Sequence, residues 1–376
     1  MHLIHKLRSM AQFMTMVRPL RLLHSWHNCT GYLPLEITLW LTYRCNAHCS
    51  FCIFTSSEES RREALSAGEL STEQIYRLLD DLAALGTRRT MITGGEPTLR
   101  EDLVDIVAYA TRHKIRTGIF TNGSLLDRLL AEELVAAGID TICISLDAVD
   151  TALHDSLRNM PGLGEKVLAA LGHVDETRKR LGRKMKLVTN TVVTARNYHQ
   201  LDRIVELKAD FDFDHATFAT LLEFDELPVP NLRLSAEDRE RLDGEVIPRL
   251  REKAKRYGLP VSVLVGENPQ ITYQGTYCFS PWLYAEILPS GNVIACHRSG
   301  ALGLRFGNVG HESFSEIWNG EKLRAFRRTC RPPQYEMCKR CTFHIDRNQK
   351  LMRFYGLVPG FIRPLLEGKP AHEPDY

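Results

Sequence analysis

Residues 36–52 read EITLWLTYRCNAHCSFC, an apolar run followed by three cysteines in the spacing C-x3-C-x2-C. Thiolates are soft ligands that favour iron–sulfur clusters, zinc or copper(I), and a four-iron cluster ordinarily takes four of them. A loop that offers only Cys45, Cys49 and Cys52 would leave one iron of such a cluster open to a non-protein ligand. The segment therefore predicts a strand that ends in a cluster-binding loop.

Phe51, the aromatic residue before the third cysteine, completes a pattern that resembles the radical S-adenosylmethionine (radical SAM) superfamily. The resemblance implies a [4Fe-4S] cluster on the three cysteines, with S-adenosylmethionine (SAM) chelated to its open iron. Taken by themselves, the cysteines could also belong to a zinc knuckle, whose usual unit is C-x2-C or C-x4-C paired with a second unit. They could also be buried small hydrophobes.

Composition and charge narrow the class of protein. The 376 residues are 44% hydrophobic and 25% charged, which is typical of a soluble globular chain, and the length suggests one large barrel plus an appendage. A net charge of +2 gives no case for a nucleic-acid partner. The short cysteine spacings indicate metal ligation in a reducing compartment. We expect neither a signal peptide nor a transmembrane segment, and therefore a cytoplasmic location.

From residue 35 onward, short apolar segments alternate with helical periodicity, which is typical of parallel βαβ units. Strands are expected at 36–41, 90–93, 117–121, 141–146, 186–193 and 215–220, and helices at 71–85, 103–113, 124–137, 166–181, 197–207 and 235–257. The predicted fold class is α/β, with a partial (β/α)6 TIM-like barrel and a small C-terminal α+β iron–sulfur domain. Functional groups in such barrels gather at the carboxyl ends of the strands.

The predicted domain order follows from these patterns. An N-terminal helical extension (1–34) precedes the barrel (35–234), and a helical linker (235–276) leads to the iron–sulfur domain (277–345) and a tail (346–376). The extension is basic and rich in apolar residues. A helix packed on the barrel is the favoured interpretation of it, over a segment that binds a membrane surface or a partner.

Three motifs fall at predicted strand ends: Gly-Gly-Glu-Pro from position 94, Thr-Asn-Gly from 121 and Ser-Leu-Asp from 145. Paired glycines let a backbone approach a ligand closely. The resemblance implies that Glu96 binds the amino group of SAM and that Ser145 binds its carboxylate or ribose. Arg158 would hold the carboxylate, because a guanidinium matches two oxygens at once. The Thr-Asn-Gly segment could also be a plain turn, and Asn190 a satisfied strand residue. The predicted cofactor-binding residues are Phe51, Gly94, Gly95, Glu96, Thr121, Asn122, Ser145, Asp147, Arg158 and Asn190.

A second set of cysteines lies near the C-terminus, as C-x12-G-x4-C between 278 and 296 and C-x2-C at 338–341. The turn at 289–292 predicts a hairpin. The set resembles the twitch or SPASM-like auxiliary-cluster module, which implies that Cys278, Cys296, Cys338 and Cys341 bind one auxiliary [4Fe-4S] cluster. Zinc is the alternative metal. Cys330 is left over, as a structural thiol or an alternative ligand. Two further cysteines, at positions 29 and 143, are expected to pack rather than to bind metal.

The implied activity is that of an oxidoreductase. Reduced by a flavodoxin or ferredoxin, it would cleave SAM to a 5′-deoxyadenosyl radical that abstracts hydrogen from an unactivated C–H bond, and the auxiliary cluster would accept the second electron. Few residues precede the first strand, which favours a small-molecule or natural-product intermediate, such as a sugar or an aminocyclitol. A peptide-modifying maturase is the second choice. A non-catalytic iron–sulfur carrier would have no use for the polar groups at the strand ends, and a zinc-stabilised binding protein is a further alternative. Residues considered as a general base are Asp212, Asp214, His215 and Glu223.

Overall fold

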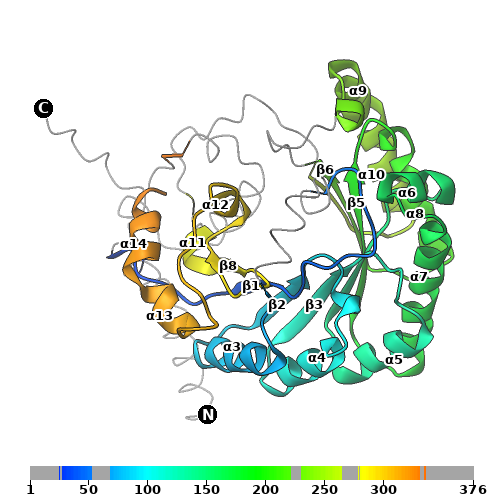
Figure 1. Ribbon diagram of the computed structural model, residues 1–376. Helices are drawn as coiled ribbons and strands as arrows, with labels where there is room; N and C mark the ends of the chain where they lie inside the picture. Colours follow the sequence, from blue (N-terminus) through cyan, green and yellow to red (C-terminus); the bar gives the residue numbers. More distant parts are fainter. Residues whose placement is uncertain are drawn as a thin grey trace, which may run out of the picture.

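In this computed structural model, the described residues are 25, 28–52, 68–221, 230–264, 278, 280–330 and 334–335. They form a nine-stranded sheet in the order β7-β6-β5-β4-β3-β2-β1-β8-β9, curved into an open barrel (Figure 1). The first six strands are parallel neighbours. Their bounds are β1 Glu36–Trp40, β2 Arg89–Thr93, β3 Arg116–Thr121, β4 Thr141–Ser145, β5 Lys186–Val193 and β6 His215–Thr220. The predicted partial (β/α)6 barrel is confirmed.

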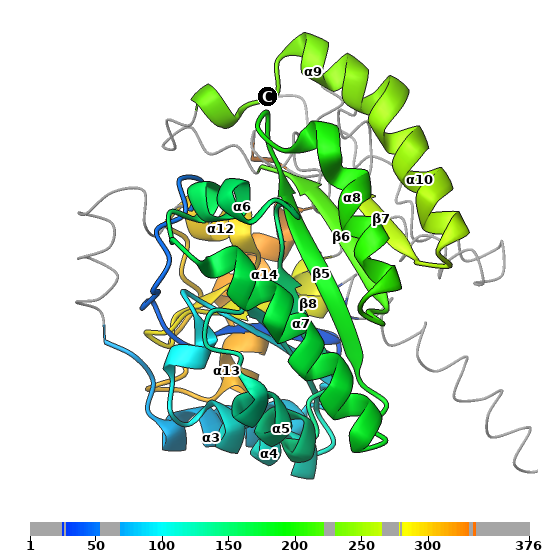
Figure 2. The same cartoon turned by 90° about the vertical axis from the view of Figure 1, so that its right-hand side faces the viewer.

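Helices cover the outer face of this sheet, as Figure 2 shows for α7 and α8 beside β5 and β6. Their bounds are α3 Thr72–Ala84, α4 Leu103–Arg112, α5 Arg128–Ala137, α6 Thr151–Arg158, α7 Leu163–Arg180 and α8 Leu201–Glu206. Helix α3 begins with a capping box, in which Ser71 and Gln74 satisfy each other's backbone amides. Helix α6 was not predicted, because its eight residues make little more than two turns.

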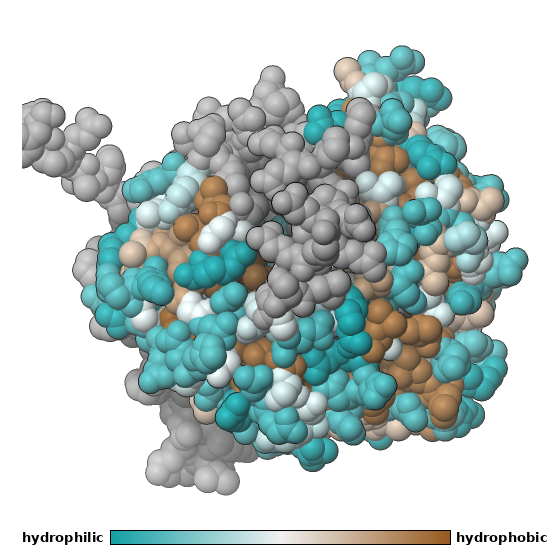
Figure 3. All heavy atoms as spheres, in the orientation of Figure 1, coloured by the Kyte–Doolittle hydropathy of each residue, from teal (hydrophilic) through white to brown (hydrophobic). Residues whose placement is uncertain are grey.

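The strands bury one face against the helices. In β5, the side chains of Leu187, Thr189, Thr191 and Val193 are buried, whereas those between them are partly or fully exposed and face the barrel interior. Successive side chains of a strand point to opposite faces, so β5 separates a dry core from an accessible lumen. The face seen in Figure 3 is mainly hydrophilic in its described part, with apolar residues gathered near α5.

The segment 235–276 was predicted to be a helical linker, but it contains a further strand. Helix α9 (Ala236–Arg241) continues through a π-helical turn (Leu242–Val246) into α10 (Ile247–Arg256). Strand β7 (Val261–Leu264) then pairs parallel with β6. This segment therefore adds another βα unit to the barrel edge.

The C-terminal domain is continuous with the barrel sheet. Strand β8 (Tyr284–Ile287) pairs parallel with β1, and β9 (Val293–Ile294) pairs antiparallel with β8, which confirms the predicted hairpin. The helices of this domain lie beside β1 in Figure 1. They are α11 Ser280–Leu283, α12 His297–Ala301, α13 Phe314–Asn319 and α14 Glu321–Arg328.

Part of the N-terminal extension packs against this C-terminal domain. The indole N–H of Trp282 donates to the Ser25 carbonyl at 3.1 Å, and that of Trp318 donates to the Tyr32 carbonyl at 2.5 Å. Most of the extension and the whole predicted tail lie outside the described residues. Within the described part of the chain, no helix is long and apolar enough to cross a membrane.

Candidate active site

The three-cysteine loop follows the carboxyl end of β1. Cys49 is buried, and Cys45 and Cys52 are partly buried. Burial raises the pKa of the Cys49 thiol to about 11, and the nearby Arg158 guanidinium opposes that rise. None of the three cysteines forms a disulfide, so all three sulfurs are available to a metal.

Helix α6 fixes the backbone of this loop. The amide of His48 donates to the carbonyl of Arg158 at 3.2 Å, and the amide of Ser50 donates to the carbonyl of Leu157 at 3.4 Å. The last carbonyls of a helix have no partner within the helix. The cysteine loop therefore caps α6, and α6 in turn sets the position of Cys49.

The paired glycines after β2 serve the approach of one backbone segment to another. The amide of Gly95 donates to the Thr42 carbonyl at 2.7 Å, and the amide of Glu96 donates to the Arg44 carbonyl at 2.8 Å. A side chain at Gly94 would collide with the Thr42 carbonyl, and Gly94 also has a φ of 142°. Glycine tolerates both conditions. The two glycines thus let the second strand end lie directly against the segment that leads into Cys45.

Glu96 connects the ends of β2 and β3 and is only 1% exposed. One carboxylate oxygen accepts from the amide and hydroxyl of Thr98, at 3.1 and 2.6 Å, and from the hydroxyl of Thr121 at 2.7 Å. The other oxygen accepts from the amide of Asn122 at 2.6 Å. Burial raises the pKa of the Glu96 carboxyl above its usual range, and these hydrogen bonds oppose the rise. All four donors are neutral, so a cationic ligand would complete the site.

Asn46, which was not predicted as a site residue, joins the cysteine loop to the Thr-Asn-Gly motif. Asn122 donates from its side-chain amide to the Asn46 side-chain oxygen at 2.9 Å, and Asn46 donates to the Ser124 hydroxyl at 2.8 Å. The side-chain oxygen of Asn122 accepts from the amide of Ser124 at 2.8 Å. The signal in the sequence was an amide residue directly after Cys45.

Asp147 and Arg158 form a buried ion pair beside the cysteine loop. Arg158 Nε donates to an Asp147 carboxylate oxygen at 2.7 Å, and the other oxygen accepts from the amide of Val192 at 2.8 Å. The Asp147 side chain is fully buried. The predicted contact between Asp147 and the cofactor stays a prediction.

His154, on α6, is buried without exposed surface and accepts at Nδ1 from the amide of Asp147 at 3.1 Å. Burial lowers the pKa of His154 to about 4. In the unfolded chain the His154 imidazole binds a proton below about pH 6.5, whereas in the folded chain it does so only below about pH 4. The free energy of unfolding therefore falls as the pH drops through this window.

Because of His154 alone, we expect the free energy of unfolding of cluster-free protein to be about 2 kcal/mol lower at pH 5 than at pH 7. Denaturant titrations at the two pH values measure it. A His154→Asn variant, whose side-chain oxygen can accept from the same amide, should lose correspondingly less stability over that range. Equal losses in both proteins would contradict the assignment.

Ser145, the last residue of β4, is the register neighbour of Asn190, which lies in the middle of β5. Both side chains are partly buried, and the described residues offer neither of them a hydrogen bond. Their predicted contacts with SAM stay predictions.

Below this level lies a lumen cavity of about 400 Å³. Its walls are lined mainly by the first and third residues of the strands, and it reaches up to Phe120, the neighbour of Thr121. Phe120 is 36% exposed. The cavity-lining residues with polar side chains are Arg89, Thr141, Cys143, Lys186, Asp214, His215 and Thr217.

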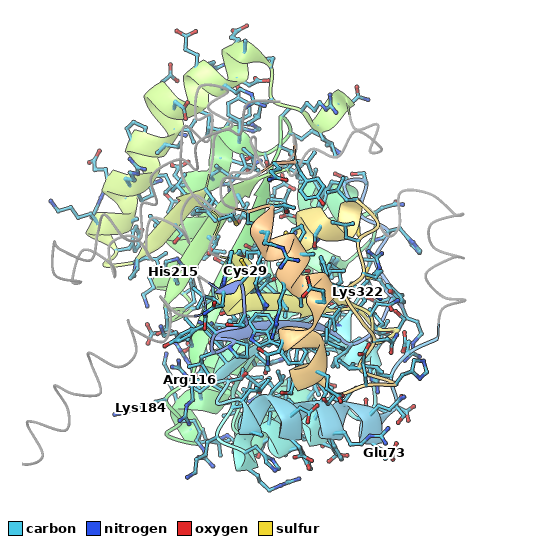
Figure 4. All side chains as sticks on the ribbon, turned by 90° about the vertical axis from the view of Figure 1, so that its left-hand side faces the viewer. Cys29, Glu73, Arg116, Lys184, His215 and Lys322 are labelled. Carbon is cyan, nitrogen blue, oxygen red and sulfur yellow. The ribbon has the colours of Figure 1, made fainter. Side chains whose placement is uncertain are left out.

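The residues considered as a general base lie at the opposite end of the barrel. His215 begins β6, and Asp212 and Asp214 precede it. Arg178 and Lys208 form ion pairs with these two aspartates. Figure 4 shows Arg116, Lys184 and His215 on one side of the molecule, the side formed by the strand starts. The fourth candidate, Glu223, lies outside the described residues.

In the C-terminal domain, Cys278 and Cys296 are both buried. The amide of Cys278 donates to the Cys330 carbonyl at 3.1 Å, and the Cys296 sulfur accepts from the amide of Ser299 at 3.4 Å. Cys330 therefore lies beside a predicted ligand. The other two predicted ligands, Cys338 and Cys341, lie outside the described residues. The cysteines at positions 29 and 143 are buried, as expected for packing residues.

The donor set of the first loop fits a cluster with one open iron. Among the described residues, no three His, Cys, Asp or Glu side chains are arranged to hold a single metal ion. Three thiols that each bind a different iron of a cubane need not converge on one point, whereas the ligands of a zinc site must.

Comparisons with known proteins agree with this geometry. The family model of the radical SAM superfamily matches residues 41–207, and that of the SPASM iron–sulfur cluster-binding domain matches residues 278–342. An AdoMet-dependent heme synthase of Methanosarcina barkeri is 27% identical over 78% of this chain and 85% of its own. A PqqA peptide cyclase of Granulibacter bethesdensis is 29% identical over 82% of this chain and 79% of its own.

Among solved structures, Streptococcus suis SuiB bound to its precursor peptide SuiA is similar in fold. Its TM-score is 0.67 at 19% identity, over 85% of this chain and 72% of SuiB. The matched models cover the cysteine loop, the barrel from β2 to β5 and the C-terminal domain. They imply that the chain binds SAM, the [4Fe-4S] cluster that holds SAM and an auxiliary iron–sulfur cluster. The chain belongs to the radical SAM superfamily and carries a SPASM-like auxiliary-cluster module after its barrel.

Proposed function

We propose that this protein is a peptide-modifying radical SAM enzyme that oxidises its substrate at an unactivated C–H bond. The observation that carries the substrate class is the similarity to the PqqA peptide cyclase, because it extends over 82% of the chain and so includes residues of both domains. The small-molecule substrate expected from the sequence is unconfirmed, and its support is the similarity to the AdoMet-dependent heme synthase. The comparisons favour the peptide alternative.

When bound, the reduced cluster with its chelated SAM supplies a 5′-deoxyadenosyl radical, the hydrogen-abstracting species of this chemistry. The work of the chain is to bind, to orient and to exclude water. Glu96 would hold the SAM ammonium group, since its buried carboxylate is held only by neutral donors. Ser145 and Asn190 would bind the ribose or carboxylate from the lumen wall. A flavodoxin or ferredoxin remains the proposed reductant.

A second candidate substrate is an iron porphyrin. It is favoured by the similarity to the AdoMet-dependent heme synthase, which extends over 78% of this chain. The peptide is preferred because the PqqA peptide cyclase is the more similar relative, 29% against 27% identical over 82% against 78% of this chain.

Deuterium transfer separates the two candidates. The anaerobically reconstituted enzyme is incubated with SAM and dithionite, and with either side-chain-deuterated peptides from short reading frames beside the gene or propionate-deuterated iron coproporphyrin. We expect deuterium in 5′-deoxyadenosine only with a peptide, and a peptide product lighter by two hydrogen atoms. One hydrogen leaves with 5′-deoxyadenosine, and the other leaves as a proton while its electron passes to the auxiliary cluster. Transfer from the porphyrin alone would contradict the peptide assignment.

A further inference from the structure

The Arg158 guanidinium has three neighbours that belong to the cluster site or support it. Nη1 lies 3.9 Å from the Cys49 sulfur, and Nε lies 2.7 Å from the Asp147 carboxylate. The guanidinium carbon lies 5.4 Å from the centroid of the Phe51 ring. Arg158 is only 8% exposed, so protein groups surround most of this side chain.

Asp147 holds the guanidinium in this orientation. Its second carboxylate oxygen accepts from the amide of Val192, and its backbone carbonyl accepts from the Asn197 side chain at 2.8 Å. Both contacts anchor Asp147 to the region around the end of β5. With Nε on Asp147 and Nη1 on Cys49, two of the three guanidinium nitrogens are already engaged by the protein.

We propose that Arg158 is a positioning residue for the cluster, one that donates a hydrogen bond to the Cys49 sulfur and raises the reduction potential of the SAM-binding cluster. The inference replaces the role expected from the sequence, a bidentate contact with the SAM carboxylate. It rests on the proposed function only in that Cys45, Cys49 and Cys52 bind that cluster.

The physical argument concerns charge. A cluster gains one negative charge on reduction, and a hydrogen bond from a cationic donor to a ligand sulfur stabilises the more negative state. The interaction is strong here because the donor is buried and screened little by solvent. Asp147 offsets the net charge of Arg158, but it lies on the Nε side of the guanidinium, whereas Nη1 reaches the sulfur.

Arg158 also links the reduction potential of the SAM-binding cluster to the geometry of the cysteine loop. Its carbonyl accepts from the amide of His48, while its side chain reaches Cys49. The same residue therefore holds the loop backbone and contacts a ligand sulfur. Lysine would keep the charge but lose the planar fork that spans Asp147 and Cys49.

The test uses the holoenzyme and three variants. Arg158→Gln alone would leave Asp147 buried without its partner, which is costly, so the double variant Asp147→Asn/Arg158→Gln removes both charges together. Arg158→Lys keeps the charge. Arg178→Gln is the matched control, because Arg178 is also 8% exposed and paired with carboxylates, but on α7.

Potentiometric titration followed by electron paramagnetic resonance measures the potential, and the SAM-binding cluster is identified as the signal that changes when SAM is added. We expect the double variant to keep its iron and to show a reduction potential that is lower by at least about 59 mV. For one electron, this shift is a tenfold change in the equilibrium constant of electron transfer. Arg158→Lys should fall in between, and Arg178→Gln should match the wild type.

An unchanged potential in the double variant, together with a large loss of SAM affinity, would overturn this inference and restore the carboxylate contact. A potential that rises would overturn it as well. Wild-type protein without any SAM-responsive cluster would overturn the inference and the proposed function together. The first two outcomes leave the proposed function intact.

Discussion

Replacing Cys49 by alanine is expected to abolish SAM cleavage and to remove about four irons per chain, the content of one cubane. Cys49 is the most deeply buried of the three cysteines in the loop. Its sulfur also receives the hydrogen bond from Arg158. In the described loop after β1, the only other cysteines are Cys45 and Cys52, which are themselves predicted ligands, so no replacement ligand is available there.

The matched control is Cys143→Ala, the same chemical change at a buried cysteine in the barrel interior. Cys143 lines the lumen cavity and is not part of either predicted ligand set, so its variant should keep the wild-type iron content. Iron and sulfide analysis, with 5′-deoxyadenosine measured under dithionite, gives the readout. A Cys49→Ala protein that keeps all its iron and cleaves SAM normally would show that the loop is not the cofactor site.

Much of the barrel could be predicted from the sequence because parallel strands are covered by helices and appear as short apolar runs. The bounds of β5 and β6 agree with the prediction, and those of the other four strands agree to within one residue. The helices between them carry strong three- and four-residue periodicity, which is the most reliable local signal.

The edges of the sheet could not be predicted in the same way. Strand β7 has only four residues, all of them partly or fully exposed, so its sequence carries no burial pattern. Strand β8 pairs with β1, more than 240 residues earlier in the chain. Pairing at such a separation depends on the folded barrel and produces no pattern in the local sequence.

The contacts within the candidate site could not be predicted from the sequence. Arg158 was expected to hold the SAM carboxylate, yet α6 turns that residue back onto Asp147 and Cys49. Two of the general-base candidates could have been excluded from the sequence. Residues that precede a strand lie at the amino end of a parallel barrel, away from the chemistry, and Asp212 and Asp214 precede β6.

Replacing Glu96 by alanine is expected to produce the largest loss of stability in the cofactor site, about 3 kcal/mol or more of unfolding free energy. The change would leave four donors without their acceptor: the amide and hydroxyl of Thr98, the hydroxyl of Thr121 and the amide of Asn122. Each buried donor that loses its partner costs about 1–3 kcal/mol, and these costs do not simply add. Denaturant unfolding of cluster-free protein at pH 7 measures the loss.

Glu96→Gln separates stability from binding. The amide keeps the size of the side chain and one acceptor oxygen, so the protein should fold with a smaller loss of about 1–2 kcal/mol, caused by the amide group that now faces the Asn122 amide. It carries no charge to pair with an ammonium group, so SAM affinity measured by calorimetry on reconstituted protein should fall sharply. Glu101→Ala, an exposed glutamate five residues away, should change stability by no more than about 0.5 kcal/mol. Wild-type SAM affinity in Glu96→Gln would leave Glu96 as a link between the strand ends and nothing more.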